Sequence, residues 1–278
     1  MNLSIQGLSK TYPNGVKALE DITLTLAPGM FGLLGPNGAG KSTLMRTLAT
    51  LQEADTGTVT LGDLDVLRDK EQVRRTLGYL PQEFGLSPKA KAIDLLDTFA
   101  IMKGITVRSE RAAVVEALLR KTNLWEHRNK RVGGYSGGMK RRFGIAVALL
   151  GDPRLIIVDE PTAGLDPAER ARFHNLLAEL GRDAIVLLST HIVEDVANLC
   201  PTVAVLYGGR IQLQGSPEEL CARLAPRLFA RFVDGDEVPA LQEALPVIST
   251  RLRAGRHELR VLADTAPDGF APATPTLE

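Results

Sequence analysis

Apolar and polar residues alternate at two places near the start of the chain, in residues 3–8 and 22–26. Such alternation is typical of strands that bury one face. Further on, the chain carries short uninterrupted apolar runs, which are typical of parallel strands covered on both faces. These runs occupy residues 31–34, 155–158 and 184–188. We therefore predict an α/β fold with a parallel central sheet and an antiparallel N-terminal part.

Helical periodicity separates the predicted strands. Apolar residues recur at helical spacing in residues 42–51 and 167–180, which predicts one helix in each segment. From about residue 83 to residue 150 the periodicity is helical and no strand is convincing. We therefore expect a helical insert within the α/β domain.

The last fifty residues differ in character from the rest. We expect the α/β domain to cover residues 1–225, and a small α+β appendage of three strands and one helix to cover residues 226–263. Residues 264–278 contain three prolines and few large apolar residues, so we expect a disordered tail there.

The composition is that of an ordinary globular protein. Lys and Arg total 33 and Asp and Glu total 33, and a neutral chain is not expected to coat nucleic acid or an anionic membrane. Two cysteines and four scattered histidines show no zinc-type spacing. No signal peptide is expected at the N-terminus, and the longest apolar run, residues 143–150, is far shorter than the roughly 20 residues of a membrane span. We expect a cytoplasmic chain that reaches a membrane only through a partner.

A glycine-rich turn follows the predicted strand at residues 31–34. Residues 35–42 read GPNGAGKS, which fits the phosphate-loop pattern G-x-x-x-x-G-K-[ST] between a buried strand and an amphipathic helix. Successive backbone N–H groups and the positive end of the helix bind phosphate oxygens in such a loop. Lys41 should reach the β- and γ-phosphates, and the Ser42 hydroxyl should ligate Mg²⁺. We predict a P-loop NTPase core.

Two carboxylates end the buried strand at residues 155–158. Asp159 leaves the carboxyl edge of that strand, where it can hold the Mg²⁺ ion, and Glu160 is the candidate general base for the attacking water. The sequence therefore predicts hydrolysis of a bound nucleotide.

Taken together, the motifs resemble the ATP-binding cassette (ABC) ATPases over roughly residues 1–222. The matching segments, in the family's order and spacing, are residues 35–43, Gln82, residues 135–139, residues 155–160, residues 164–166 and His191. The family signature appears here as Tyr-Ser-Gly-Gly-Met, with Tyr135 in place of the common Leu and Met139 in place of Gln.

The resemblance implies ATP as the substrate nucleotide and assigns further residues to its site. Tyr12 resembles the aromatic residue that stacks on adenine. Gln82 resembles the glutamine that contacts Mg²⁺ and the attacking water, and His191 the histidine that hydrogen-bonds the γ-phosphate. Asp166 resembles the aspartate at the dimer contact. The ATP-binding set implied is Tyr12, Gly35, Pro36, Asn37, Gly38, Ala39, Gly40, Lys41, Ser42, Thr43, Ser136, Gly137, Gly138 and Asp166.

The signature implies a second chain. Ser136, Gly137 and Gly138 open a helix whose N-terminus suits a γ-phosphate. In the family that phosphate belongs to ATP held by the opposite subunit, so two cassettes close head-to-tail around two ATP molecules. The resemblance implies a second copy or a paralogous ATPase as partner, separate membrane permease subunits, and a position on the inner face of the cell membrane. Residues just after Gln82, including Phe84, Gly85 and Leu86, should receive a short helix of the permease.

Three functions remain open at this point: a transporter ATPase subunit, a soluble ABC ATPase of translation or DNA repair, and a module that binds ATP without turnover. A single set of motifs argues against the translation type, and the lack of a sustained heptad repeat argues against the repair type. Both Glu160 and His191 are present, which argues against a module without turnover. Residues 77–86 and the short C-terminal appendage resemble bacterial drug, antibiotic or lipid exporter subunits. This resemblance implies an exporter, and an importer subunit is the alternative.

Overall fold

The computed structural model describes residues 1–82, 85–162 and 165–277, and these form two compact units, Met1–Gln214 and Gly215–Glu278. The expectations for Phe84 and Gly164 lie outside the described residues. No helix in the described part of the chain is both long and apolar enough to cross a membrane.

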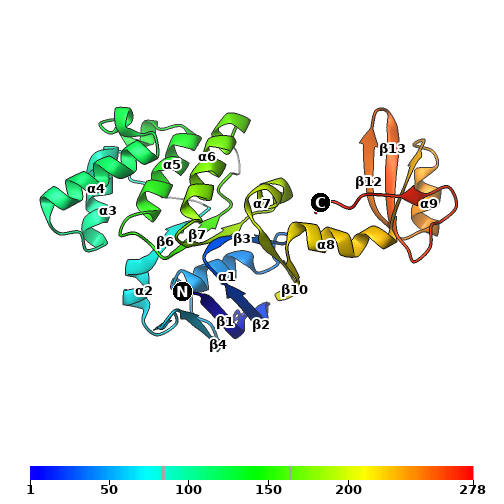
Figure 1. Cartoon of the computed structure of the whole chain (residues 1–278), viewed down its shortest axis with the longest axis horizontal. Coiled ribbons are helices and arrows are strands. Elements are labelled where there is room, and N and C mark those ends of the chain that lie inside the picture. Colours follow the sequence, from blue (N-terminus) through cyan, green and yellow to red (C-terminus); the bar gives the residue numbers. More distant parts are fainter. Residues whose placement is uncertain (83–84, 163–164, 278) are drawn as a thin grey trace. The chain divides into compact units, whose positions relative to one another are not determined.

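The first unit contains two sheets (Figure 1). The smaller sheet is antiparallel, in the order β2-β1-β4-β5, and the larger one has the order β10-β9-β3-β8-β7-β6. In the larger sheet, β9, β3, β8, β7 and β6 run parallel to one another. The bounds are β1 Leu3–Thr11, β2 Lys17–Leu26, β3 Gly29–Leu34, β4 Thr56–Leu61, β5 Leu64–Asp65, β6 Leu77–Leu80, β7 Leu155–Asp159, β8 Ile185–Ser189, β9 Thr202–Tyr207 and β10 Arg210–Gly215.

Helix α1 (Lys41–Leu48) lies between the two sheets (Figure 1). Its Leu44, Met45 and Leu48 are fully buried in one apolar cluster with side chains of β1, β2, β3 and β7. Full burial of such a side chain stabilises the fold by about 1.5–3 kcal/mol. The start of α1 is thereby fixed against the carboxyl edge of the parallel sheet.

The helical insert has an apolar cluster of its own. Helices α3 (Ala92–Met102), α4 (Arg108–Lys121) and α5 (Gly137–Ala148) pack together around Leu96, Leu119 and Phe143. Because these side chains bury one another, the insert keeps its shape without adding a strand to the sheet. The other helices of this unit are α2 Lys70–Thr76, α6 Pro167–Leu180 and α7 Val193–Leu199.

The second unit is a four-stranded sheet with two helices. The sheet order is β12-β13-β11-β14, and the three strands and one helix expected from the sequence are β11, β12, β13 and α9. The bounds are α8 Pro217–Leu224, β11 Leu228–Val233, α9 Val238–Ala244, β12 Val247–Arg253, β13 Arg256–Leu262 and β14 Ala271–Pro272.

The boundary between the units differs from the expected one after residue 225. Helix α8 belongs to the second unit, because it packs against the 3₁₀ helix Ala225–Arg227 that leads into β11. The first unit therefore ends at Gln214.

Part of the segment expected to be a disordered tail packs on the second unit, as far as strand β14 at Ala271–Pro272. Phe270 is 7% exposed and packs in the apolar cluster of the second unit with Phe229 and Leu259. Strand β14 pairs with β11 through Phe229 and Pro272. One buried aromatic side chain and one strand pairing thus order this part of the segment in spite of its proline-rich composition.

Candidate functional site

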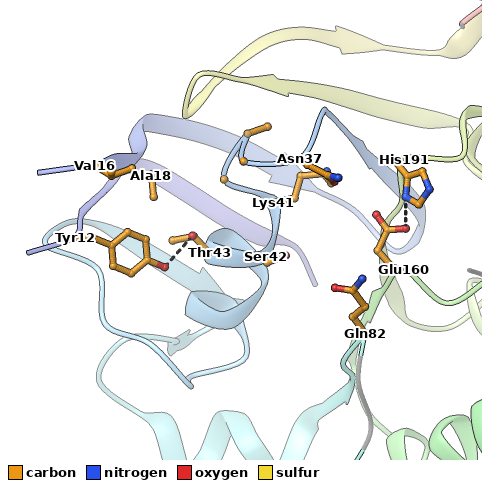
Figure 2. A pocket seen from close by; sticks show the side chains of 13 residues that line it. Tyr12, Val16, Ala18, Asn37, Lys41, Ser42, Thr43, Gln82, Glu160 and His191 are labelled. Atoms are coloured by element: carbon orange, nitrogen blue, oxygen red, sulfur yellow. Dashed lines mark hydrogen bonds and ion pairs between the residues drawn. The ribbon is translucent and has the colours of Figure 1, made fainter. Parts of the chain in front are cut away.

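A cavity of about 360 Å³ opens at the start of α1 (Figure 2). It brings together segments that lie far apart in the sequence: the turn after β1, the loop before α1, and the ends of β6, β7 and β8. The lining residues are Tyr12, Val16, Ala18, Asn37, Gly38, Ala39, Gly40, Lys41, Ser42, Thr43, Gln82, Glu160 and His191. Most of the residues predicted to contact a nucleotide therefore border one space.

The loop before α1 has the backbone that a phosphate cradle requires. Gly38 and Gly40 have φ values of 80° and 107°, which only glycine adopts without strain. A Cβ at Gly40 would come within 2.2 Å of the Ala18 carbonyl oxygen. The Lys41 ammonium donates to the carbonyl oxygens of Gly35 and Pro36 at 2.6 and 3.1 Å. The loop is thus wound around a buried cation.

Tyr12 is fixed at the opposite end of the cavity. Its hydroxyl lies 3.1 Å from Thr43 Oγ1 and donates to Gln52 Oε1 at 3.1 Å. Its backbone N–H donates to the Val16 carbonyl at 2.9 Å, so Tyr12 and Val16 close the same turn. Figure 2 shows the ring beside the loop and α1, across from Glu160 and His191.

Glu160 and His191 face each other at the mouth of the cavity (Figure 2). Glu160 Oε2 lies 2.7 Å from His191 Nδ1, and the glutamate side chain is 8% exposed against 58% for the histidine. The Glu160 N–H donates to the Ser189 carbonyl at 2.8 Å, which joins the ends of β7 and β8. Glu160 has a φ of 49°, an uncommon conformation for a residue that is not glycine, and such strain concentrates at functional sites.

Asp159 lies at the last position of β7 and is 4% exposed. Its Oδ1 atom is buried without a hydrogen-bond partner. The pKa of the nearby Tyr79 is raised, chiefly by burial of its hydroxyl and secondly by the negative charge of Asp159. A buried carboxylate oxygen without a donor fits a hard divalent cation, and the Ser42 hydroxyl and the Gln82 side chain are oxygen donors of the same kind. The donor set therefore fits Mg²⁺.

The signature residues do not line this cavity. Ser136 and Gly137 are exposed, and Ser136 Oγ accepts from the Met139 N–H at 3.2 Å as the N-cap of α5. Gly138 is buried, and a Cβ there would come within 2.8 Å of Glu169 Oε2. Tyr135, the departure from the common signature, is buried and donates to the His127 carbonyl at 3.0 Å.

Asp166 is also exposed and outside the cavity, and it caps α6 by accepting from the Glu169 N–H at 2.8 Å. Gly35, Pro36 and Asp159 complete the predicted set without lining the cavity.

Two residues that line the cavity have no counterpart in the prediction, Val16 and Ala18. Val16 is 54% exposed, so part of its apolar side chain is free to contact a ligand. The signal that points to them is the register of the hairpin, since Thr11 pairs with Lys17 and brings both residues close to Tyr12.

The cysteines carry no chemistry at this site. Cys200 is buried, and burial raises the pKa of its thiol to about 12. The thiol therefore stays protonated and unreactive at neutral pH.

The family model described as "ABC transporter" matches residues 19–163. The chain belongs to the ABC transporter family. It carries the ATP-binding, ATP-hydrolysing domain of that family.

Individual members of the family support this assignment. The daunorubicin resistance ATP-binding protein DrrA3 of Streptomyces coeruleorubidus is 36% identical over 92% of this chain and 82% of its own length. The probable multidrug ABC transporter ATP-binding protein YbhF of Escherichia coli is 33% identical over 82% of this chain, which spans only 39% of YbhF. The dimeric post-hydrolysis structure of the ATP-binding cassette MJ0796, bound to ADP and Pi, is 25% identical with a TM-score of 0.70 and covers 77% of this chain and 98% of its own.

Proposed function

We propose that this ABC transporter subunit hydrolyses ATP to drive export by separate membrane subunits. Similarity to proteins named for daunorubicin resistance and Nod factor export supports the direction of transport. We propose that the membrane proteins are separate chains and that this subunit sits beside them on the inner face of the cell membrane.

The phosphate end of the cavity accounts for ATP binding. Lys41 would pair with the β- and γ-phosphate oxygens while the N–H groups of residues 38–43 donate to the same anion. At the far end, Tyr12, Val16 and Ala18 offer an aromatic face and apolar surface of the kind that contacts an adenine ring. Ser42, Gln82 and Asp159 would hold Mg²⁺, which neutralises charge that develops on the phosphates.

The contact between Glu160 and His191 is the observation that carries the proposal. A buried carboxylate at the mouth of the cavity, oriented by an imidazole 2.7 Å away, suits a general base for the attacking water. His191, with its more exposed ring, would donate to the γ-phosphate. The two side chains thus supply activation of water and stabilisation of charge at one place.

A second cassette would complete the site. Ser136 and Gly137 are exposed at the N-terminus of α5, and they do not line the cavity of their own chain. We propose that they bind the γ-phosphate of ATP held by a second copy or a paralogue, and that Asp166 lies at the same interface. The similarity to MJ0796, which is a dimer bound to ADP and Pi, supports an assembly of two cassettes.

Turnover by the purified chain tests the role of Glu160. Glu160→Gln keeps the shape of the side chain and removes the proton acceptor, so we expect kcat to fall about 10²–10⁴-fold. Glu126→Gln, the same change at an exposed position of the insert, is the matched control and should hydrolyse ATP at the wild-type rate. Normal turnover by Glu160→Gln would remove Glu160 from the mechanism.

Crosslinking tests the membrane partner. A Cβ at Gly85 meets no atom within 4 Å, so a photoreactive side chain fits there without disturbing the fold. In native membranes a probe at Gly85 should crosslink to an integral membrane protein, and a probe at exposed Glu179 should not. Crosslinks from position 85 only to soluble proteins, or equal crosslinking from both positions, would contradict the permease contact.

A further inference from the structure

A buried polar cluster lies outside the cavity and joins three segments of the first unit. Asp195 in α7 is 1% exposed and accepts a hydrogen bond from the hydroxyl of Thr162, which is also 1% exposed. The other carboxylate oxygen of Asp195 lies 3.0 Å from His174 Nε2 and 3.8 Å from Arg170 Nε, both on α6.

The positions of Thr162 and Asp195 along the chain connect this cluster to the Glu160–His191 pair. Thr162 follows Glu160 by two residues, and Asp195 follows His191 by four. The Glu160 N–H already bonds the Ser189 carbonyl, so the segments that carry the two residues are joined at that end. The hydroxyl of Thr162 joins them again on the other side of the pair.

The cluster contains a buried carboxylate, that of Asp195, where a neutral contact would stabilise the fold equally well. Burying a carboxylate is costly, and a buried ion pair adds little net stability compared with apolar packing. Asp195 Oδ1, His174 Nε2 and Arg170 Nε make no well-directed hydrogen bond in spite of their burial. Such an arrangement fixes a position more than it stabilises the fold.

We infer that Thr162 and Asp195 are positioning residues that set the Glu160 carboxylate against His191 for attack on the γ-phosphate. The inference rests on the roles proposed for Glu160 and His191. Arg170 and His174 hold the Asp195 carboxylate from α6, and Asp195 holds the hydroxyl of Thr162. The segment that carries Glu160, whose backbone has a φ of 49°, is thereby bonded to the segment that carries His191 both at residue 160 and at residue 162. A displacement of about 1 Å at such a site can lower turnover by roughly 10²-fold.

The test replaces the hydroxyl and keeps the volume. Thr162→Val should lower kcat by roughly 10–100-fold while KM for ATP and the affinity for a fluorescent ATP analogue stay within about twofold, because the phosphate loop is untouched. Thr162→Ser restores the hydroxyl and should restore kcat. Thr122→Val is the matched control, since Thr122 is also 1% exposed and its hydroxyl donates to the Leu118 carbonyl within the insert.

The outcomes separate this inference from a structural role and from the proposed function. Loss of stability in Thr162→Val with a normal kcat per folded molecule, or a loss of kcat that Thr162→Ser does not reverse, would overturn the inference. If Thr162→Val does not fold, Asp195→Asn takes its place, with the same expected split between kcat and KM and the same contradicting result. Inactive Glu160→Gln beside fully active Thr162→Val refutes only the positioning pair, whereas active Glu160→Gln refutes the proposed mechanism itself.

Discussion

At the scale of single residues, the cavity depends on one buried cation. Lys41 is 7% exposed and its ammonium group bonds two carbonyl oxygens of its own loop. We propose that phosphate oxygens would meet both this cation and backbone N–H donors of the loop, so the loop should bind polyphosphates more tightly than a neutral loop would.

We therefore expect Lys41→Ala to weaken ATP binding roughly 10–100-fold, which corresponds to the worth of about 1.5–3 kcal/mol for a charged hydrogen bond. Titration of the purified variant with a fluorescent ATP analogue measures this, and Lys140→Ala, an exposed lysine on α5, is the control. An unchanged Kd together with wild-type turnover would show that the loop does not bind the phosphates.

The sequence predicted the residues of the phosphate loop because their pattern is local. Glycines at fixed spacing before a lysine specify a backbone conformation, and the structure has positive φ at Gly38 and Gly40. Val16 and Ala18 could not be predicted in this way, since only the pairing of β1 with β2 brings them to the cavity.

At the scale of elements, the sequence predicts some helix ends and misses others. Helix α6 begins and ends where the sequence predicts, because Asp166 supplies the cap and Pro167 the first residue. Helix α1 ends at Leu48 instead of residue 51, because Thr50 adopts a φ of 61° that no sequence pattern indicates. The residue types predict a helix cap such as that of α6, whereas the surrounding packing imposes the strained end of α1 at Thr50.

The cap of α5 provides a test of the signature. Ser136→Ala removes the acceptor for the Met139 N–H and should lower the free energy of unfolding by about 1 kcal/mol. Ser136→Asp keeps a cap and stability close to that of the wild type, but it places a negative charge where the γ-phosphate of the second chain is proposed to bind. Chemical denaturation measures the first effect and ATPase activity the second. An Asp variant that hydrolyses ATP at the wild-type rate would argue against the signature contact.

At the scale of the whole molecule, the sequence patterns predict which strands exist but not how they are ordered. The strand predicted at residues 155–158 corresponds to β7. Its neighbours in the sheet could not be predicted, because β6 is separated from β7 in sequence by the helical insert and β8 by α6. The second unit shows the limit of composition as a guide. Three prolines indicated disorder, but Phe270 in the same segment is buried against Phe229 and Val233.

This packing predicts a local effect of Phe270→Ala. Deleting a buried phenylalanine side chain costs about 3–5 kcal/mol, which should unfold much of the 64-residue unit Gly215–Glu278. Hydrogen exchange should accelerate in β11 and β13, while ATP affinity stays at the wild-type value because the cavity belongs to the first unit. Protection of β11 and β13 equal to that of the wild type would show that the tail adds nothing to this core.

The central claim concerns two chains and two nucleotides. If Glu160 is the general base and Ser136 contacts the partner's ATP, Glu160→Gln binds Mg²⁺-ATP without hydrolysing it, and the bound nucleotides hold two chains together by charge-assisted hydrogen bonds. Size-exclusion chromatography with light scattering measures the mass with and without Mg²⁺-ATP. We expect the Glu160→Gln variant to have the mass of one chain without nucleotide and of two chains with Mg²⁺-ATP. The wild type should return to the mass of one chain after hydrolysis. A Glu160→Gln variant that stays at the mass of one chain in saturating Mg²⁺-ATP would contradict the account.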